Sequence, residues 1–299
     1  MEDTEGFWAE AAEELHWFRR WDQVFEWKYP LFRWFLGGET NLSYNCVDHH
    51  VGRGRGNRAA IVWESPETGK SRVLTYSALL REVERFAAAL KALGVGKGDT
   101  VTIYMPVLPE AAVAMLATTR IGAIHSVVFA GFGSPALGER IVDAGSKVVV
   151  TADLAHRKGR RIPLKVTVDE ALRTPNAVEK VLVLRRGVQE PPMTEGRDLS
   201  WEEALELGEG ETARAVAMEA NEPAFILYTS GTTAKPKGTV HVHGGYQVHI
   251  HAMGRWVFDM KEEDTFWATS DIGWVVGHSY ILYAPLLIGC STVMYEGVP

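Results

Sequence analysis

A short apolar run, followed by a loop rich in small, hydroxyl-bearing and basic residues, most constrains what this chain can fold into. The run from Ala224 to Tyr228 has the length and composition of a buried strand. A triphosphate needs accessible backbone N–H groups, hydroxyl donors and positive charge. The pattern G-x-x-x-x-G-K-[ST] occurs nowhere in the chain, so we predict a phosphate site that differs from the P-loop. The candidate phosphate-binding residues are Thr229, Ser230, Gly231, Thr232, Thr233, Ala234, Lys235, Lys237 and Gly238.

The composition is that of a soluble globular protein, because 46% of the 299 residues are hydrophobic and 23% are charged. The net charge of −7 gives no electrostatic reason to expect nucleic-acid binding. Cys46 and Cys290 are the only cysteines, so we expect no disulfide framework and a cytoplasmic location. The acidic N-terminus has no apolar run of the signal-peptide type.

One segment is long and apolar enough to raise the question of a membrane span. Residues 272–295 contain no Asp, Glu, Lys or Arg. The same segment contains His278, Ser279, Pro285 and three glycines, which favour a buried core segment beside a pocket. We therefore expect no membrane partner.

Apolar strands alternate with helical patterns from residue 58 onward. The strands are short and do not alternate between apolar and polar residues, as expected for parallel sheets covered by helices on both faces. The fold class predicted is therefore α/β. Expected strands cover 59–64, 101–105, 124–129, 147–151, 180–184 and 224–228, and expected helices cover 77–93, 109–122 and 135–143. Residues 187–222 are predicted to be a surface excursion.

Two domains are expected, divided near residue 58. Residues 1–58 are aromatic-rich and are predicted to be a short helical extension that docks on the main domain, residues 59–299. A partner-binding surface is the alternative for the extension.

Two further segments contain residue types suited to ligand binding. Asp271–Tyr280 contains Trp274, Val275, Val276 and Gly277, and His156–Arg161 places four cations within five residues. Taken alone, the first is ordinary apolar core and the second a solvated charged loop. Two H-x-H pairs, at 241/243 and 249/251, suit zinc on a strand, but no cysteine or carboxylate has matching spacing, so we expect no metal site there.

The order Tyr-Thr-Ser-Gly-Thr-Thr-x-Lys-Pro-Lys-Gly, from Tyr228 to Gly238, resembles the phosphate loop of the adenylate-forming enzymes. Ala234 stands where that family normally has glycine. The segments at 44–48, 119–126, 244–246 and 271–280 resemble one group within it, the short-chain acyl-CoA synthetases. The resemblance implies an acyl pocket formed by Trp274, Val275, Val276 and Gly277. It implies coenzyme A binding by Phe129, Ala130, Gly131, Arg157, Lys158, Gly159, Arg160 and Val276.

The activity implied is ATP-dependent activation of acetate or propionate to an acyl-adenylate, followed by transfer to coenzyme A, with Mg²⁺ as a cofactor. Acetate enzymes usually have threonine where Val276 stands, but one methylene discriminates by only ~1–3 kcal/mol, so both acids stay open. An adenylation domain that loads a carrier protein is the alternative enzyme.

Enzymes of this family are roughly twice as long, and their catalytic lysine lies in a C-terminal domain, so no catalytic residue is assigned here. We therefore expect a truncated large domain with little turnover alone, a split-gene subunit completed by a second chain, or an inactive remnant. We also expect that Ala234→Gly would improve adenylation in a completed enzyme, because a glycine at positive φ would be strained as alanine.

Overall fold

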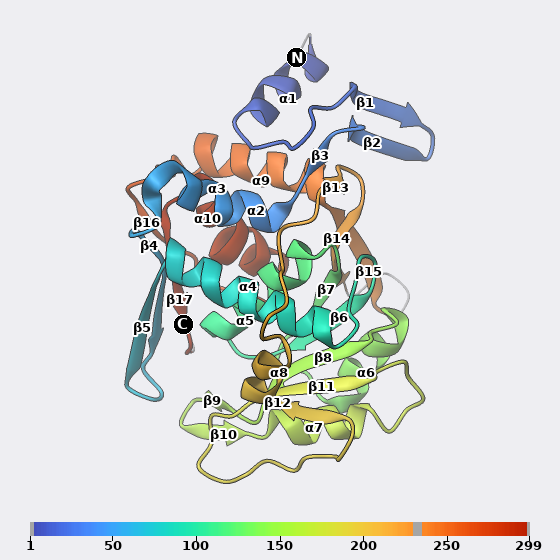
Figure 1. Cartoon of the computed structure of the whole chain (residues 1–299), viewed down its shortest axis with the longest axis vertical. Coiled ribbons are helices and arrows are strands. Elements are labelled where there is room, and N and C mark those ends of the chain that lie inside the picture. Colours follow the sequence, from blue (N-terminus) through green and yellow to red (C-terminus); the bar gives the residue numbers. More distant parts are fainter. Residues whose placement is uncertain (1–2, 230–234, 298–299) are drawn as a thin grey trace.

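A seven-stranded sheet forms the centre of the computed structural model, which describes residues 3–229 and 235–297 (Figure 1). All neighbouring strands are parallel except the last pair, which is antiparallel. The strand order is β12 (Asp198–Ser200), β11 (Lys180–Leu184), β8 (Val148–Ala152), β6 (Thr100–Tyr104), β7 (Ile124–Val127), β14 (Pro223–Thr229) and β15 (Lys237–Val242). The predicted α/β class is confirmed.

Strands β6 and β8 are buried along their whole length, which explains their unbroken apolar pattern. Around the sheet, helix α4 (Tyr76–Ala92) packs on α5 (Pro109–Arg120), and α6 (Ser134–Asp143) packs on α7 (Leu164–Ala171). The α4 helix begins at the Thr75 side chain, which accepts a hydrogen bond from the Ala78 N–H. The six strands and three helices predicted from the sequence are all present, with ends shifted by at most two residues.

A second sheet of four strands contains β16 (Thr265–Trp267), β17 (Ser291–Tyr295), β4 (Ala59–Ser65) and β5 (Lys70–Thr75). Between β16 and β17 lie a π-helical segment, η2 (Gly277–Tyr283), and α10 (Ala284–Ile288), both largely buried. The apolar segment 272–295 is therefore mostly a core segment, as predicted, although Trp274, Val275 and Val276 are exposed. In the part of the chain that the structure describes, no helix is long and apolar enough to cross a membrane.

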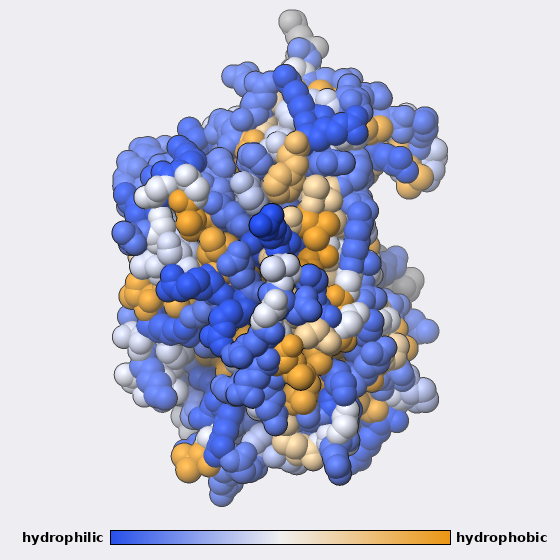
Figure 2. Space-filling view, viewed as in Figure 1, coloured by the Kyte–Doolittle hydropathy of each residue, from blue (hydrophilic) through white to orange (hydrophobic). Residues whose placement is uncertain are grey.

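The N-terminal segment is only partly helical, which corrects the prediction of a helical extension. After α1 (Thr4–Glu13), strands β1 (Gln23–Lys28) and β2 (Leu31–Leu36) form an antiparallel hairpin that projects beside α1 (Figure 1). Aromatic and β-branched residues favour strands, and here they outweigh the interleaved charges. Figure 2 shows apolar residues at the end of this hairpin, where Leu31 and Phe32 are exposed.

The hairpin leads into the elements that attach this segment to the rest of the protein. Strand β3 (Glu39–Thr40) pairs with β13 (Met218–Glu219), and α2 (Leu42–Cys46), α3 (Asp48–His50) and a π-helical turn, η1 (Val51–Arg55), follow. The Arg120 guanidinium reaches Asp48 with two nitrogens, at 2.6 and 2.9 Å. Two segments that the sequence analysis treated separately, 44–48 and 119–126, are thus joined by one ion pair.

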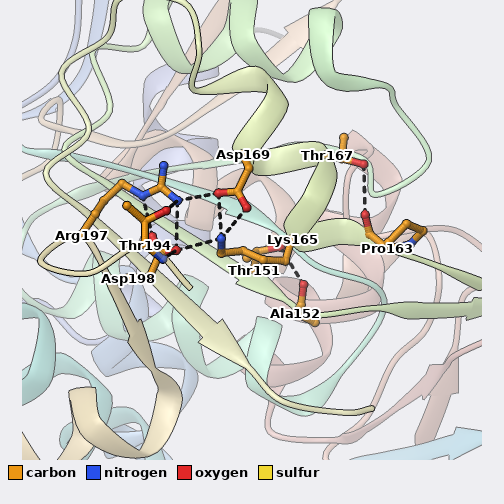
Figure 3. Close-up of polar contacts among 9 residues, drawn as sticks. All are labelled: Thr151, Ala152, Pro163, Lys165, Thr167, Asp169, Thr194, Arg197 and Asp198. Carbon is orange, nitrogen blue, oxygen red and sulfur yellow. Dashed lines mark hydrogen bonds and ion pairs between the residues drawn. The ribbon is translucent and has the colours of Figure 1, made fainter. Parts of the chain in front are cut away.

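The stretch 187–222 is more ordered than a surface excursion, so that prediction was wrong. It contains β12, β13 and α8 (Trp201–Leu207), whose start carries a capping box between Ser200 and Glu203. Buried Lys165 of α7 holds this stretch, because its Nζ lies 2.7 Å from Asp169 and 2.8 Å from Asp198 (Figure 3). Arg197 reaches the same two carboxylates.

Candidate active site

The predicted phosphate loop connects β14 to β15 and is therefore a hairpin loop between antiparallel strands. Thr229 and Lys237 are paired at its mouth, and both are exposed together with Lys235 and Gly238. Five of the predicted residues, Ser230, Gly231, Thr232, Thr233 and Ala234, lie outside the described residues. The described ends place two lysines and one hydroxyl at the same edge of the sheet.

The basic segment predicted for coenzyme A forms a tight hairpin between β9 (Ala155–Arg157) and β10 (Arg160–Ile162). Lys158 and Gly159 form its two-residue turn, with φ of 52° and 69°. The Glu67 carboxylate accepts hydrogen bonds from both of their N–H groups, at 2.7 and 2.8 Å. Arg157 and Arg160 are directly opposite each other in the register, so their side chains leave the hairpin on the same face.

Residues predicted for two different ligands meet in one cleft of about 290 Å³. The Arg157 guanidinium lies 5.2 Å from the centre of the Phe129 ring, and the Trp274 ring lies 5.5 Å from that same ring. Backbones also approach closely here, because a Cβ added to Gly273 would lie 2.7 Å from the Phe129 Cα. The structure therefore brings together Phe129, Ala130, Gly131, Arg157 and Trp274.

Val275 and Val276 line a different and more apolar groove, of about 600 Å³. Tyr246 and His241 line the same groove, as does Trp34 of the N-terminal hairpin. Val276 was also predicted to contact coenzyme A, and the structure places it in this groove and not in the lining of the Arg157 cleft. Predicted residues Lys158, Gly159, Arg160 and Gly277 line neither cavity.

Asp271 is a cleft residue that the sequence analysis did not select. Its Oδ1 accepts a hydrogen bond from the Gly273 N–H at 2.8 Å. Burial raises the pKa of this carboxyl, while that hydrogen bond and the positive charge of Arg157 oppose the rise. Its position as the acidic first residue of an otherwise apolar segment was the available signal.

Buried histidines lie beneath the Trp274 segment. The His278 Nδ1–H donates to the Trp274 carbonyl at 3.1 Å, and His125 Nε2 lies 2.6 Å from the Tyr283 hydroxyl. Burial lowers the pKa of His278 to about 3 and that of His125 well below its usual range, so both rings are neutral at pH 7. His278 thus supports the backbone that presents Trp274, and the His125 ring lies 5.4 Å from that of His278.

The histidines of the two H-x-H pairs do not converge. His241 lies on β15, whereas His243 begins helix α9 (His243–Trp256) and accepts a hydrogen bond from the Leu42 N–H through Nδ1. His249 packs near Trp8, and His251 lies 4.0 Å from Glu14. Within residues 3–229 and 235–297, no group of three or more His, Cys, Asp or Glu is arranged to hold a metal ion.

Comparison with known proteins shows the family to which this chain belongs. The family model described as AMP-binding enzyme matches residues 47–299. The chain belongs to the family of AMP-binding enzymes. The model described as acetyl-coenzyme A synthetase N-terminus matches residues 1–46 of this family member.

Curated relatives of this AMP-binding enzyme match along almost its whole length. It is 54% identical over 297 residues to the acetyl-coenzyme A synthetase of Rubrobacter xylanophilus, covering 99% of this chain and 46% of the relative. It is 48% identical to the acetyl-coenzyme A synthetase of Deinococcus radiodurans, covering 100% and 46%. It is 52% identical to the 3-hydroxypropionyl-coenzyme A synthetase of Sulfurisphaera tokodaii, covering 100% and 46%. The chain thus spans about half the length of the curated relatives it matches.

Proposed function

We propose that this chain supplies the ATP-phosphate, acid and coenzyme A sites of a short-chain acyl-CoA synthetase that forms AMP. A carboxylate oxygen attacks the α-phosphorus of ATP, the bond from that phosphorus to the bridging oxygen breaks, and pyrophosphate leaves. The coenzyme A sulfur then attacks the acyl carbon of the mixed anhydride, and AMP leaves with the bonding electrons. The acid and both cosubstrates are small molecules.

The observation that carries the proposal is the shared cleft of Arg157, Phe129 and Trp274. Two arginines paired directly opposite each other repel, and an anionic ligand removes that repulsion. Guanidinium groups suit phosphate because their donors form a planar, permanently charged fork. Arg157 and Arg160 would therefore bind the nucleotide phosphates of coenzyme A. The cleft beside Phe129 and Gly131 would lead its thiol toward Trp274.

Lys235 and Lys237, with Thr229, would hold the phosphates that leave during the first step. Positive charge placed where negative charge develops lowers the barrier of such a displacement. Mg²⁺ enters the proposal as the counter-ion of the ATP phosphates.

The acid is proposed to have two or three carbons. Trp274 beside the Arg157 cleft, and Val275 and Val276 in the apolar groove, are all exposed, and these bulky and β-branched side chains would leave little room for the acyl group. The names of the relatives, which cite acetyl- and 3-hydroxypropionyl-coenzyme A, cover this range of sizes. The two unpaired thiols, Cys46 and Cys290, support a reducing cytoplasm as the place of action.

Ligand binding tests the proposal directly, because it is measured without turnover. Calorimetric titration of the 299-residue chain should detect α,β-methylene-ATP with Mg²⁺ and, separately, coenzyme A. Lys237→Met should weaken binding of the nucleotide and leave the affinity for coenzyme A unchanged. Lys70→Met, at an exposed lysine of β5, should change neither affinity. If the folded chain binds neither ligand at millimolar concentration, the proposal is overturned.

A further inference from the structure

A buried cation between two aromatic rings connects helix α6 to the base of the phosphate loop. The Arg140 side chain belongs to a residue only 9% exposed. Its guanidinium carbon lies 4.8 Å from the centre of the Phe132 ring and 5.5 Å from that of the Tyr228 ring. Arg140 Nη1 also donates to the Ala136 carbonyl at 2.6 Å, which fixes the guanidinium on its own helix.

Helix α6 also forms a hydrogen bond with Tyr228. The Tyr228 hydroxyl donates to Asp143 Oδ2 at 2.7 Å, one turn after Arg140 on α6. Burial, the hydrogen bond to Asp143 and its negative charge raise the pKa of Tyr228, so the hydroxyl remains a donor. Tyr228 directly precedes Thr229 and is paired with Gly238, so it lies one residue pair before the mouth of the loop. Helix α6 therefore contacts the β14–β15 hairpin through Arg140 and Asp143, immediately before the phosphate loop.

The second ring that Arg140 contacts, Phe132, leads to the coenzyme A cleft. The Phe132 ring meets Phe129 at 5.5 Å and Trp274 at 5.9 Å, both edge to face. Phe129 and Trp274 form the wall of the cleft that also contains Arg157. One chain of contacts thus runs from the phosphate loop through Arg140 to the acyl and coenzyme A residues.

We infer that Arg140 is a positioning residue, which fixes the mouth of the phosphate loop relative to the wall of the coenzyme A cleft. The inference rests on the proposed function for the identity of the two ligands. Its structural part does not, because the stack and the Tyr228–Asp143 hydrogen bond are independent of any ligand. A desolvated cation beside an aromatic ring is strongly attracted to it, and methionine keeps most of the side-chain volume of arginine without the charge.

Amide hydrogen exchange of the 299-residue chain tests the structural part. Arg140→Met should speed exchange about tenfold at the loop end of the β14–β15 ladder, near Tyr228 and Gly238. Exchange at the far end, near Phe225 and His241, should stay within about twofold. Arg140→Lys should restore part of the protection, and Glu139→Gln, at the exposed neighbour on α6, should have no effect. Unchanged loop-end exchange, or an equal increase in every strand of the sheet, would overturn the inference.

Nucleotide affinity tests the functional part. Arg140→Met should weaken binding of α,β-methylene-ATP with Mg²⁺ about tenfold, and Arg140→Lys should recover part of the affinity. Glu139→Gln is the reference variant, with whose melting temperature those of the Arg140 variants are compared. Faster loop-end exchange with unaltered nucleotide affinity would show that the stack is structural only and would reject the positioning role. A wild-type chain that binds no nucleotide would instead reject the proposed phosphate site, and exchange would still decide whether Arg140 fixes the hairpin.

Discussion

Arg157 and Arg160 lie directly opposite each other across the two-residue turn of the β9–β10 hairpin. The turn itself is anchored from outside by Glu67, whose carboxylate accepts the N–H groups of Lys158 and Gly159. Like charges at directly opposed positions destabilise a strand pair. The hairpin therefore holds two positive charges opposite each other, an arrangement that is more stable with an anion bound than without one.

The first prediction concerns this arginine pair. Arg157→Ala and Arg160→Ala should each weaken coenzyme A binding about tenfold to a hundredfold, because each removes a charge-assisted hydrogen bond to phosphate worth about 1.5–3 kcal/mol. Arg161→Ala, at the next position and on the other face of β10, is the matched control. Titration with coenzyme A and with its dephosphorylated form identifies which phosphate is bound. An equal loss in Arg161→Ala would indicate only a general effect of charge.

The second prediction concerns the Lys165 network. Lys165→Met should lower the free energy of unfolding by about 3 kcal/mol, because it leaves the fully buried Asp198 carboxylate with one cation fewer. Urea denaturation measures the loss, with Lys70→Met at an exposed position as control. A loss below about 1 kcal/mol would mean that Arg197 alone satisfies both carboxylates.

The third prediction concerns the pH dependence of the same network. Burial alone would raise the pKa of Asp198, but hydrogen bonds from Arg197 and Lys165 outweigh it and the pKa lies below its ordinary value of 3.8. A carboxyl whose pKa is lowered by folding stabilises the protein above its unfolded pKa, and that contribution is lost as the pH falls through the folded value. The stability difference between wild type and Asp198→Asn should therefore shrink between pH 6 and pH 3. A difference that stays constant over urea titrations in this range would contradict the prediction.

The fourth prediction concerns the ion pair between Arg120 and Asp48. Arg120→Lys should destabilise the chain by about 2–4 kcal/mol. The Arg120 guanidinium donates to both Asp48 oxygens and, through Nε, to the Ala213 carbonyl, and an ammonium cannot reproduce this planar set of donors. The matched control is Arg85→Lys, at an exposed position of α4. Comparable unfolding midpoints for the two variants would show that the charge matters and the fork does not.

The order of residues was enough to predict the α/β class, the central strands and the three helices around them, because buried parallel strands have unbroken apolar runs of characteristic length. It also identified the phosphate loop and the basic segment as candidate ligand sites. It did not predict that residues 23–36 form a hairpin, since aromatic residues interleaved with charges fit a docked helix and a ribbon equally well. Asp271 was missed because it is a single charged residue beside an ordinary apolar pattern, and Arg140 because it belongs to the charged positions 139, 140 and 143 of an ordinary amphipathic helix.

The sequence by itself determined which elements would be buried and which residues are candidates for phosphate binding, because both depend on residue type and local spacing. Only the tertiary structure decided which of them act together. The cleft that joins Phe129, Arg157 and Trp274 is assembled from segments far apart in the chain, and the Tyr228–Arg140–Phe132 stack is assembled in the same way. Such contacts depend on strand order and on the packing of α6 against the sheet, and a local sequence pattern contains neither.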